Sequence, residues 1–222
     1  MHRRSACSPR RQRAALDLAA LLATWPVLTT APRGDGHPVL VLPGLLTGDP
    51  ATVLLRNVLR LLGHRSAGGA SARTGPYRRV VGALRDRLDR LHQESGRRVS
   101  LVGWSLGGLY AEELARASPG SVRTLVTLGS AVAGRSGWAR DLSTLVDRST
   151  YLPRAAGLLP RPWAERGTLR VPATSVYTRS DGIVSWAACR FEPGARREDV
   201  ECGGATSSSP TTRPCCGCFL TG

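Results

Sequence analysis

The stretch Val99-Ser100-Leu101-Val102-Gly103-Trp104-Ser105-Leu106-Gly107-Gly108-Leu109-Tyr110 decides the fold of this chain. Residues 99–102 form a short run with β-propensity and apolar ends, typical of a buried strand, and apolar residues with helical spacing follow from Leu109. Between them stands Gly-x-Ser-x-Gly, the spacing of a nucleophile elbow, in which a tight strand-to-helix turn exposes the serine hydroxyl. Gly103 and Gly107 lack the Cβ atoms that would clash where the strand and the helix approach. We therefore predict that Ser105 is a nucleophile at a helix N-terminus, whose free N–H groups favour an oxyanion.

Strand-like and helix-like segments alternate from residue 38 onward. The continuous apolar run at 38–42 is typical of a buried parallel strand, and further strands are predicted at 122–128 and 172–178. The alternation predicts an open, mainly parallel sheet with helices on both faces. Ligands bind such sheets at the carboxyl ends of the strands, and Ser105 falls at such an end.

Two segments that precede the elbow have helical patterns. In the first, Asp49 is the expected N-cap and Pro50 the first helical residue, and Gly63 ends the helix. Its expected inward face consists of Val53, Leu54, Val58, Leu61 and Leu62. The second helix is predicted over 77–94, and its expected inward face consists of Val80, Val81, Leu84, Leu88 and Leu91.

These motifs resemble the α/β-hydrolase family of the lipase and esterase type, over roughly Gly36 to Val200. Besides the elbow, the resemblance rests on VLVLPG at 39–44 and YTRSDGIVSW at 177–186, which are similar to small actinobacterial-type hydrolases. It implies the α/β-hydrolase fold with a small cap insertion at about 131–169. The family has a strand near 66–70, where this sequence is unusually rich in Gly and Ala.

The resemblance also implies the remaining site residues. The oxyanion hole would be formed by the backbone N–H groups of Leu45, after Pro-Gly, and of Leu106, after the nucleophile. Asp181 matches the family's acid, which would orient a histidine and stabilise its imidazolium form. Asp141 and Asp147 are weaker acid candidates because they lie in the expected cap. The alternative interpretation is that Gly-x-Ser-x-Gly, Pro-Gly and Ser-Asp-Gly are ordinary turns.

The histidine of such a triad is absent from its expected place. The chain order for this fold is serine, acid, histidine, whereas His2, His37, His64 and His92 all precede Ser105. His37 comes before its strand and His64 follows a helix, so both are expected at the opposite, amino edge of the sheet. His92 is expected to be a solvated helix residue. The sequence therefore provides a nucleophile and an acid without the base between them.

The C-terminal segment departs from the family after Glu201. There the resemblance implies a Gly-Ser-His, but the chain continues as Cys202-Gly203-Gly204 into a tail without strand or helix periodicity. One nucleotide lost after the Glu201 codon would account for this, because restoring it permits Glu-Val-Arg-Gly-Ser-His-Leu. We therefore divide the chain into an N-terminal basic segment with an amphipathic helix (1–35), a hydrolase domain (36–200) and a disordered, frameshifted tail (201–222).

The composition of the chain limits which partners it can bind and indicates its cellular compartment. The net charge is +15, but all 31 basic residues are arginines scattered along the chain, which disfavours a nucleic-acid surface. Weak attraction to anionic lipid surfaces fits this charge better. The apolar run after the basic N-terminus is interrupted by Asp17 and lacks a cleavage site, so we predict a cytoplasmic protein. No metal, cofactor or obligate protein partner is expected.

The function predicted from the sequence is that of a serine hydrolase acting on carboxylic esters. The apolar content of the expected cap favours an apolar acyl group, although packing within the cap would give the same composition. The missing base predicts that this chain is nearly inactive. Two alternatives remain open: a non-catalytic protein that binds apolar ligands, and an acyltransferase that uses the same serine.

Overall fold

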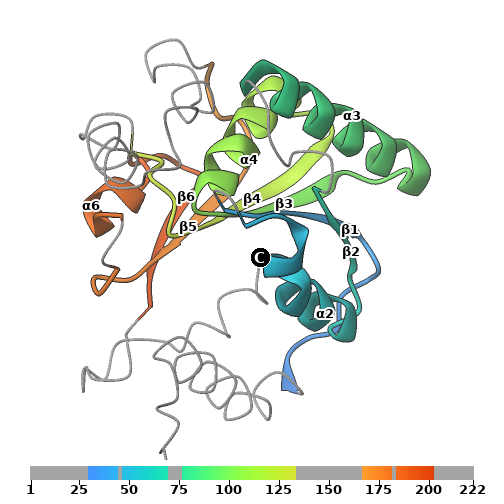
Figure 1. Ribbon diagram of the computed structural model, residues 1–222, viewed down its shortest axis with the longest axis horizontal. Helices are drawn as coiled ribbons and strands as arrows, with labels where there is room; N and C mark the ends of the chain where they lie inside the picture. The colour runs from blue at the N-terminus through green and yellow to red at the C-terminus, as the bar shows by residue number, and fades with distance from the viewer. Residues whose placement is uncertain (1–29, 45–46, 70–76, 134–166, 182–183, 203–222) are drawn as a thin grey trace, which may run out of the picture.

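The fold is built on one parallel sheet, seen in the computed structural model (Figure 1), which describes residues 30–44, 47–69, 77–133, 167–181 and 184–202. Its six strands lie in the order β2-β1-β3-β4-β5-β6, and every neighbouring pair is parallel. The strands are β1 (Pro38–Leu42), β2 (Arg65–Gly68), β3 (Val99–Trp104), β4 (Val122–Leu128), β5 (Ala173–Tyr177) and β6 (Arg197–Glu201). Among the described strands, the sheet therefore confirms the predicted parallel architecture.

Helices cover both faces of this sheet, as predicted. Helices α3 (Tyr77–Ser95) and α4 (Leu106–Ala117) lie on one face, and α2 (Val53–Leu61) lies on the other (Figure 1). The larger apolar core joins α3 and α4 to the sheet, and a smaller core forms where Leu59 of α2 meets Val39, Val41 and Val102. A short helix, α6 (Trp186–Cys189), packs beside β5.

Most of the predicted elements occur where the sequence placed them. The runs at 38–42 and 122–128 coincide with β1 and β4, and β5 lies within 172–178. Helix α3 ends one residue beyond its predicted boundary, with Val80, Leu84 and Leu88 buried and Val81 and Leu91 packed against the core. The helical period therefore identified the correct face of this helix.

Two expectations about the first helix are wrong. Asp49 does not cap it: the segment opens with a 3-10 turn, η1 (Asp49–Thr52), whose N-cap is Gly48 at φ 62°. The Asp49 carboxylate instead lies against Gly68 of β2. The inward face is also different. Of the predicted members, Leu62 is buried, whereas Val53, Leu54 and Leu61 are 42%, 54% and 58% exposed, and the buried residue within α2 is Leu59, which was not predicted. Thr52 of η1 is buried, and in α2 the side chains packed on the sheet are Leu59 and the partly buried Leu55.

The two edge strands were the least visible in the sequence. Residues 65–68 do form β2, paired with β1, although their side chains are small. A Cβ on the following Gly69 would lie 2.8 Å from the Leu42 side chain, so larger neighbours already fill this space. The sequence reasoning did not anticipate β6, because its Arg-Glu-Asp-Val-Glu sequence has charges on both faces, a composition suited to an edge strand.

Several predictions fall outside the described residues. These are the N-terminal amphipathic helix, the oxyanion residue Leu45, Asp141, Asp147, most of the expected cap and the tail from 203. Strand β6 includes Glu201, the first residue of the predicted tail. Within the described ranges, no helix combines the length and apolar character needed to cross a membrane.

Candidate active site

The turn between β3 and α4 holds Ser105 in a strained conformation. Its backbone has φ 53° and ψ −119°, and in the described part of the chain it is the one non-glycine residue with positive φ. Such a conformation costs about 1–3 kcal/mol and persists only where the surrounding structure enforces it. Ser105 directly precedes α4, so its side chain stands at the positive end of a helix dipole.

Close backbone contacts enforce this turn. A Cβ on Gly103 would lie 2.4 Å from the Cα of Gly108, so β3 and α4 touch backbone to backbone. A Cβ on Gly107 would lie 2.4 Å from the carbonyl oxygen of Leu42, so the first turn of α4 also touches the end of β1. Neither position has room for a side chain. The Gly-x-Ser-x-Gly spacing therefore has the steric origin that the sequence suggested.

The end of β1 brings the predicted oxyanion loop to the nucleophile. A Cβ on Gly44 would lie 3.4 Å from the Cβ of Ser105, so the backbone of Gly44 runs close beside the nucleophile candidate. Leu45, the residue after Gly44, lies outside the described ranges. Leu106 is the first residue of α4 and is buried. Its N–H belongs to the first helical turn, where backbone donors have no intrahelical partner.

Asp181 lies at the same edge of the sheet as Ser105. The backbone N–H of Ser105 donates to the carbonyl oxygen of Leu128, the last residue of β4, at 2.9 Å. A Cβ on the next residue, Gly129, would lie 3.3 Å from Oδ2 of Asp181. Oδ1 of Asp181 accepts a hydrogen bond from the backbone N–H of Val184 at 3.2 Å. The nucleophile candidate Ser105 therefore contacts Leu128, and the acid candidate Asp181 lies beside the next residue, Gly129.

Cys189 is the other nucleophilic side chain near this acid. It is a free, buried cysteine on α6. Burial first, and then the Asp181 carboxylate, raise the pKa of its thiol to about 12. Because the thiolate is the reactive form, Cys189 is inert at neutral pH. Ser105 is therefore the stronger nucleophile candidate at this edge.

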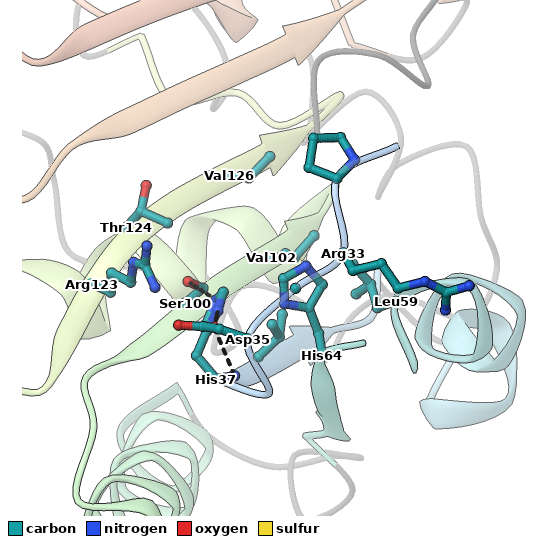
Figure 2. A pocket seen from close by; sticks show the side chains of 13 residues that line it. Arg33, Asp35, His37, Leu59, His64, Ser100, Val102, Arg123, Thr124 and Val126 are labelled. Atoms are coloured by element: carbon teal, nitrogen blue, oxygen red, sulfur yellow. Dashed lines mark hydrogen bonds and ion pairs between the residues drawn. The ribbon is translucent and has the colours of Figure 1, made fainter. Parts of the chain in front are cut away.

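His37 and His64 lie at the opposite edge, as predicted. His37 directly precedes β1 and His64 directly precedes β2, and both line a pocket at the amino ends of the strands (Figure 2). Ser100, the second residue of β3, lines the same pocket. Ser105 comes five positions later in the chain, about 16 Å away at the rise of an extended strand. Neither histidine therefore serves the elbow in this structure.

This amino edge contains a hydrogen-bonded set that sequence reasoning missed. His37 Nε2 lies 2.9 Å from Oγ of Ser100, and His37 Nδ1 lies 3.1 Å from Oδ1 of Asp35. Asp35-Gly-His is a short local signal, but only the pairing of β1 with β3 brings Ser100 to it. Throughout the described ranges, no three His, Cys, Asp or Glu side chains gather as a metal site requires.

Comparison with known proteins identifies the fold. No protein-family model matches the sequence, and no curated protein is significantly similar to it. Among solved structures, the chain is similar to the lipase BlEst2 of Bacillus licheniformis, with a TM-score of 0.55 and 17% identity over 78% of this chain and 86% of that one. It is also similar to MGS-MChE2, an α/β-hydrolase enzyme from a sediment metagenome of the Mar Chica lagoon, with a TM-score of 0.52 and 20% identity over 76% and 82% of the two chains.

A third similar structure is a soluble variant of monoglyceride lipase from Saccharomyces cerevisiae. Its TM-score is 0.51 and its identity 14%, over 77% of this chain and 80% of that one. At such identities the likeness concerns the backbone alone. Together with the parallel sheet and the strained serine turn, it shows that the chain has the α/β-hydrolase fold.

Proposed function

We propose that this chain is a serine hydrolase scaffold for carboxylic esters, with Ser105 as its nucleophile. The observation that carries the proposal is the strained backbone of Ser105, at φ 53°, directly before α4. Strain of this kind is retained where it exposes a reactive group. The turn also directs the N–H groups of the first turn of α4 toward the space beside the serine hydroxyl.

Each proposed residue has one role in ester cleavage. The Ser105 hydroxyl attacks the ester carbonyl, and the N–H groups of Leu106 and Leu45 stabilise the resulting oxyanion. Asp181 orients a histidine, which removes the proton from Ser105 and delivers it to the leaving alcohol. The position of Asp181 beside the end of β4 and the approach of Gly44 to Ser105 support these assignments.

The base is the part that this chain does not supply, because no histidine follows Asp181 in the sequence. Without it the serine hydroxyl stays protonated at neutral pH, and the rate falls by the contribution of general base catalysis, about 10²–10⁴-fold. We therefore propose that the chain as it stands is a very slow esterase. A Gly-Ser-His segment after Glu201 would follow β6, which is paired with the strand that leads to Asp181.

The proposed substrate is an ester with an apolar acyl group. Trp104 precedes the nucleophile, is 40% exposed, and lies 3.4 Å from the Cβ position of Gly44. This leaves an aromatic surface next to the elbow on which an acyl chain can pack. The proteins of similar structure include lipases, which supports an ester or lipid substrate class for this fold.

The test compares three chains in hydrolysis of p-nitrophenyl butyrate. They are the original chain, a chain repaired after Glu201 to continue Val-Arg-Gly-Ser-His-Leu, and the repaired chain with Ser105→Ala. We expect the repaired chain to exceed the original by about 10²–10⁴-fold and the Ser105→Ala substitution to abolish that gain.

Two outcomes would contradict the proposal. If the original chain is already as fast as the repaired one, another group acts as the base. If the repaired chain folds but cleaves no ester, the turn at Ser105 has no catalytic role. A protein that binds apolar ligands without turnover then becomes the preferred function.

A further inference from the structure

A second set of reactive side chains lines a pocket at the amino edge of the sheet. The pocket encloses about 240 Å³ where β1, β3 and β4 begin, on the face of the sheet covered by α2 (Figure 2). Its polar lining includes Asp35, His37, His64, Ser100 and Arg123. None of these residues takes part in the proposed chemistry of Ser105.

Three of these side chains form a hydrogen-bonded relay. Ser100 Oγ lies 2.9 Å from His37 Nε2, and His37 Nδ1 lies 3.1 Å from Asp35 Oδ1. The same carboxylate oxygen also accepts the backbone N–H of His37 at 3.2 Å, while the other oxygen pairs with Arg97. Asp35 thereby favours the tautomer with hydrogen on Nδ1, so Nε2 accepts the Ser100 hydroxyl. A nucleophile hydrogen-bonded to a base, which is in turn hydrogen-bonded to an orienting acid, is the signature of an activated serine.

The polypeptide segment that carries Asp35 and His37 is held firmly in place. The N–H of Gly34 donates to the carbonyl of Leu62 at 2.7 Å, and the N–H of Gly36 donates to the carbonyl of Gly63 at 3.0 Å. Gly34 also packs so closely on the His64 ring that a Cβ would lie 2.4 Å from it. The relay is therefore supported by the backbone between α2 and β2.

The electrostatic surroundings suit a neutral base and an anionic ligand. Burial is the main cause that lowers the pKa of His37, with Arg123 and Arg97 also lowering it and Asp35 opposing them. Burial also lowers the pKa of His64, whose Nδ1 is buried without a hydrogen-bond partner in the described structure. Within the described ranges, Arg97 is paired with Asp35, whereas Arg123 takes part in no ion pair. The pocket therefore presents an uncompensated positive charge.

We propose that Ser100 is a second nucleophilic serine, which accepts an acyl group from a small anionic acyl donor such as an acyl phosphate. In this step the Ser100 Oγ forms a bond to the carbonyl carbon, and the bond from that carbon to the phosphate oxygen breaks. Phosphate leaves with the electron pair of that bond. The Ser100 proton passes to His37 Nε2 and from there to the departing phosphate, and Arg123 attracts the anionic donor.

The position of Ser100 within the sheet makes release of the acyl group slow. Ser100 lies on β3, whose backbone is paired with β1 on one side and with β4 on the other. The N–H groups around Ser100 therefore take part in the strand ladders and do not form an oxyanion hole like that expected at Leu106. We expect one acyl group per chain and slow release, since water must attack without that stabilisation.

The test treats the full chain with acetyl phosphate and locates the acetyl group by peptide mass spectrometry. The chain contains no lysine, so background acetylation is limited largely to the terminal amine and cysteines. Neutral hydroxylamine removes the cysteine thioesters. We expect one stable acetyl ester, on Ser100, in the original chain and equally in Ser105→Ala, which separates this site from the elbow.

Matched variants test each member of the relay. His37→Gln is expected to slow acetylation of Ser100 by about 10²-fold or more, because the base is lost. Arg123→Gln is expected to slow the reaction with acetyl phosphate about tenfold while leaving that with the neutral donor p-nitrophenyl acetate unchanged. The rate should rise with pH through a midpoint below 6.5, as His37 loses its proton in the field of Asp35, His64, Arg97 and Arg123.

Three results would overturn the proposal. The first is a folded chain in which Ser100 stays unmodified. The second is labelling of Ser100 that does not depend on His37. The third is a rate that rises only above pH 9, as expected of an unassisted serine. Thermal unfolding of each variant separates these results from loss of the fold, and Asp35→Asn provides a second perturbation of the relay should His37→Gln not fold.

Discussion

The two ends of β3 hold two serines in opposite chemical situations. At the carboxyl end, Ser105 has the strained turn, the helix N-terminus and a nearby acid, but no histidine follows in the sequence. At the amino end, Ser100 has the histidine and the acid at hydrogen-bond distances, but it lies in a regular strand. If both proposals hold, the proton relay and the oxyanion site are separable parts of a serine site, built by different features of the fold.

Ser105 lacks a general base and Ser100 lacks an oxyanion hole. These two groups contribute similar factors to the rate, but they differ in how they can be restored. A general base contributes about 10²–10⁴-fold, and one oxyanion-hole donor contributes about 10²–10³-fold. A histidine can be added after β6 without disturbing the strands, because it follows an edge strand. An oxyanion hole at Ser100 would require breaking the ladder of a central strand. Only the carboxyl edge can therefore become an efficient enzyme by a local change.

The largest expected effect separates the two serines by activity. In the chain repaired after Glu201, Ser105→Ala should abolish the gain of about 10²–10⁴-fold in p-nitrophenyl butyrate hydrolysis, because the attacking group is lost. Ser100→Ala in the same chain should change the rate less than about twofold, since it lies about 16 Å along the strand from the elbow. Steady-state rates of both variants check this. Equal losses would show that the two edges are not independent.

The next effect tests the close backbone contacts of the elbow. Gly107→Ala places a Cβ 2.4 Å from the Leu42 carbonyl oxygen and 2.5 Å from that of Pro43, and backbone atoms cannot move aside easily. We expect the free energy of unfolding in urea to fall by about 3 kcal/mol.

Gly82→Ala is the matched control for this substitution. Gly82 lies in α3, and a Cβ there meets no atom within 4 Å. The same chemical change should therefore raise the free energy of unfolding by about 0.5–1 kcal/mol, through helix propensity. An unchanged stability for Gly107→Ala would mean that the elbow is looser than the structure shows.

A smaller effect is expected from the corresponding contact at the amino edge. Gly34→Ala places a Cβ 2.4 Å from the His64 ring, which is a side chain and can shift. We expect stability to fall by about 1 kcal/mol. Acetylation of Ser100 should slow as the segment carrying His37 moves, while the esterase rate of the repaired chain stays the same. Loss of both activities would contradict the separation of the two sites.

How far the sequence predicted each edge depends on how local its signals are. The elbow was predictable because strand, turn and helix are consecutive in residues 99–110, and each part has its own pattern. The face of α2 was partly mispredicted because apolar periodicity selects Val53, Leu54 and Leu61, which the structure leaves exposed. The relay was missed because Ser100 meets His37 only through the parallel pairing of Val39 with Ser100. Long-range pairings of this kind cannot be read from local periodicity.

The smallest effect concerns pH and also distinguishes the two edges. Burial, as the main cause, lowers the pKa of both His37 and His64 in the folded chain. In the unfolded chain a histidine takes up its proton near pH 6.5, so below that pH the unfolded state binds more protons than the folded state. The free energy of unfolding should therefore fall as the pH is lowered through 6.5. The effect of Asp35, whose pKa Arg97 and His37 lower, comes only at more acid pH.

Hydrogen exchange at pH 7.5 and 5.5 shows which part of the sheet becomes less stable as the pH is lowered. Amides at the start of β1 and in the link between α2 and β2 should lose protection at pH 5.5, because both histidines lie there. Amides of α4 behind Ser105 should change less, since the described part of the carboxyl edge contains no histidine. Replacing both histidines with glutamine should flatten the dependence of stability on pH between these values. A uniform loss across the sheet would instead mean that the two ends of β3 open as one cooperative unit, and the contrast between the edges would then be one of chemistry alone.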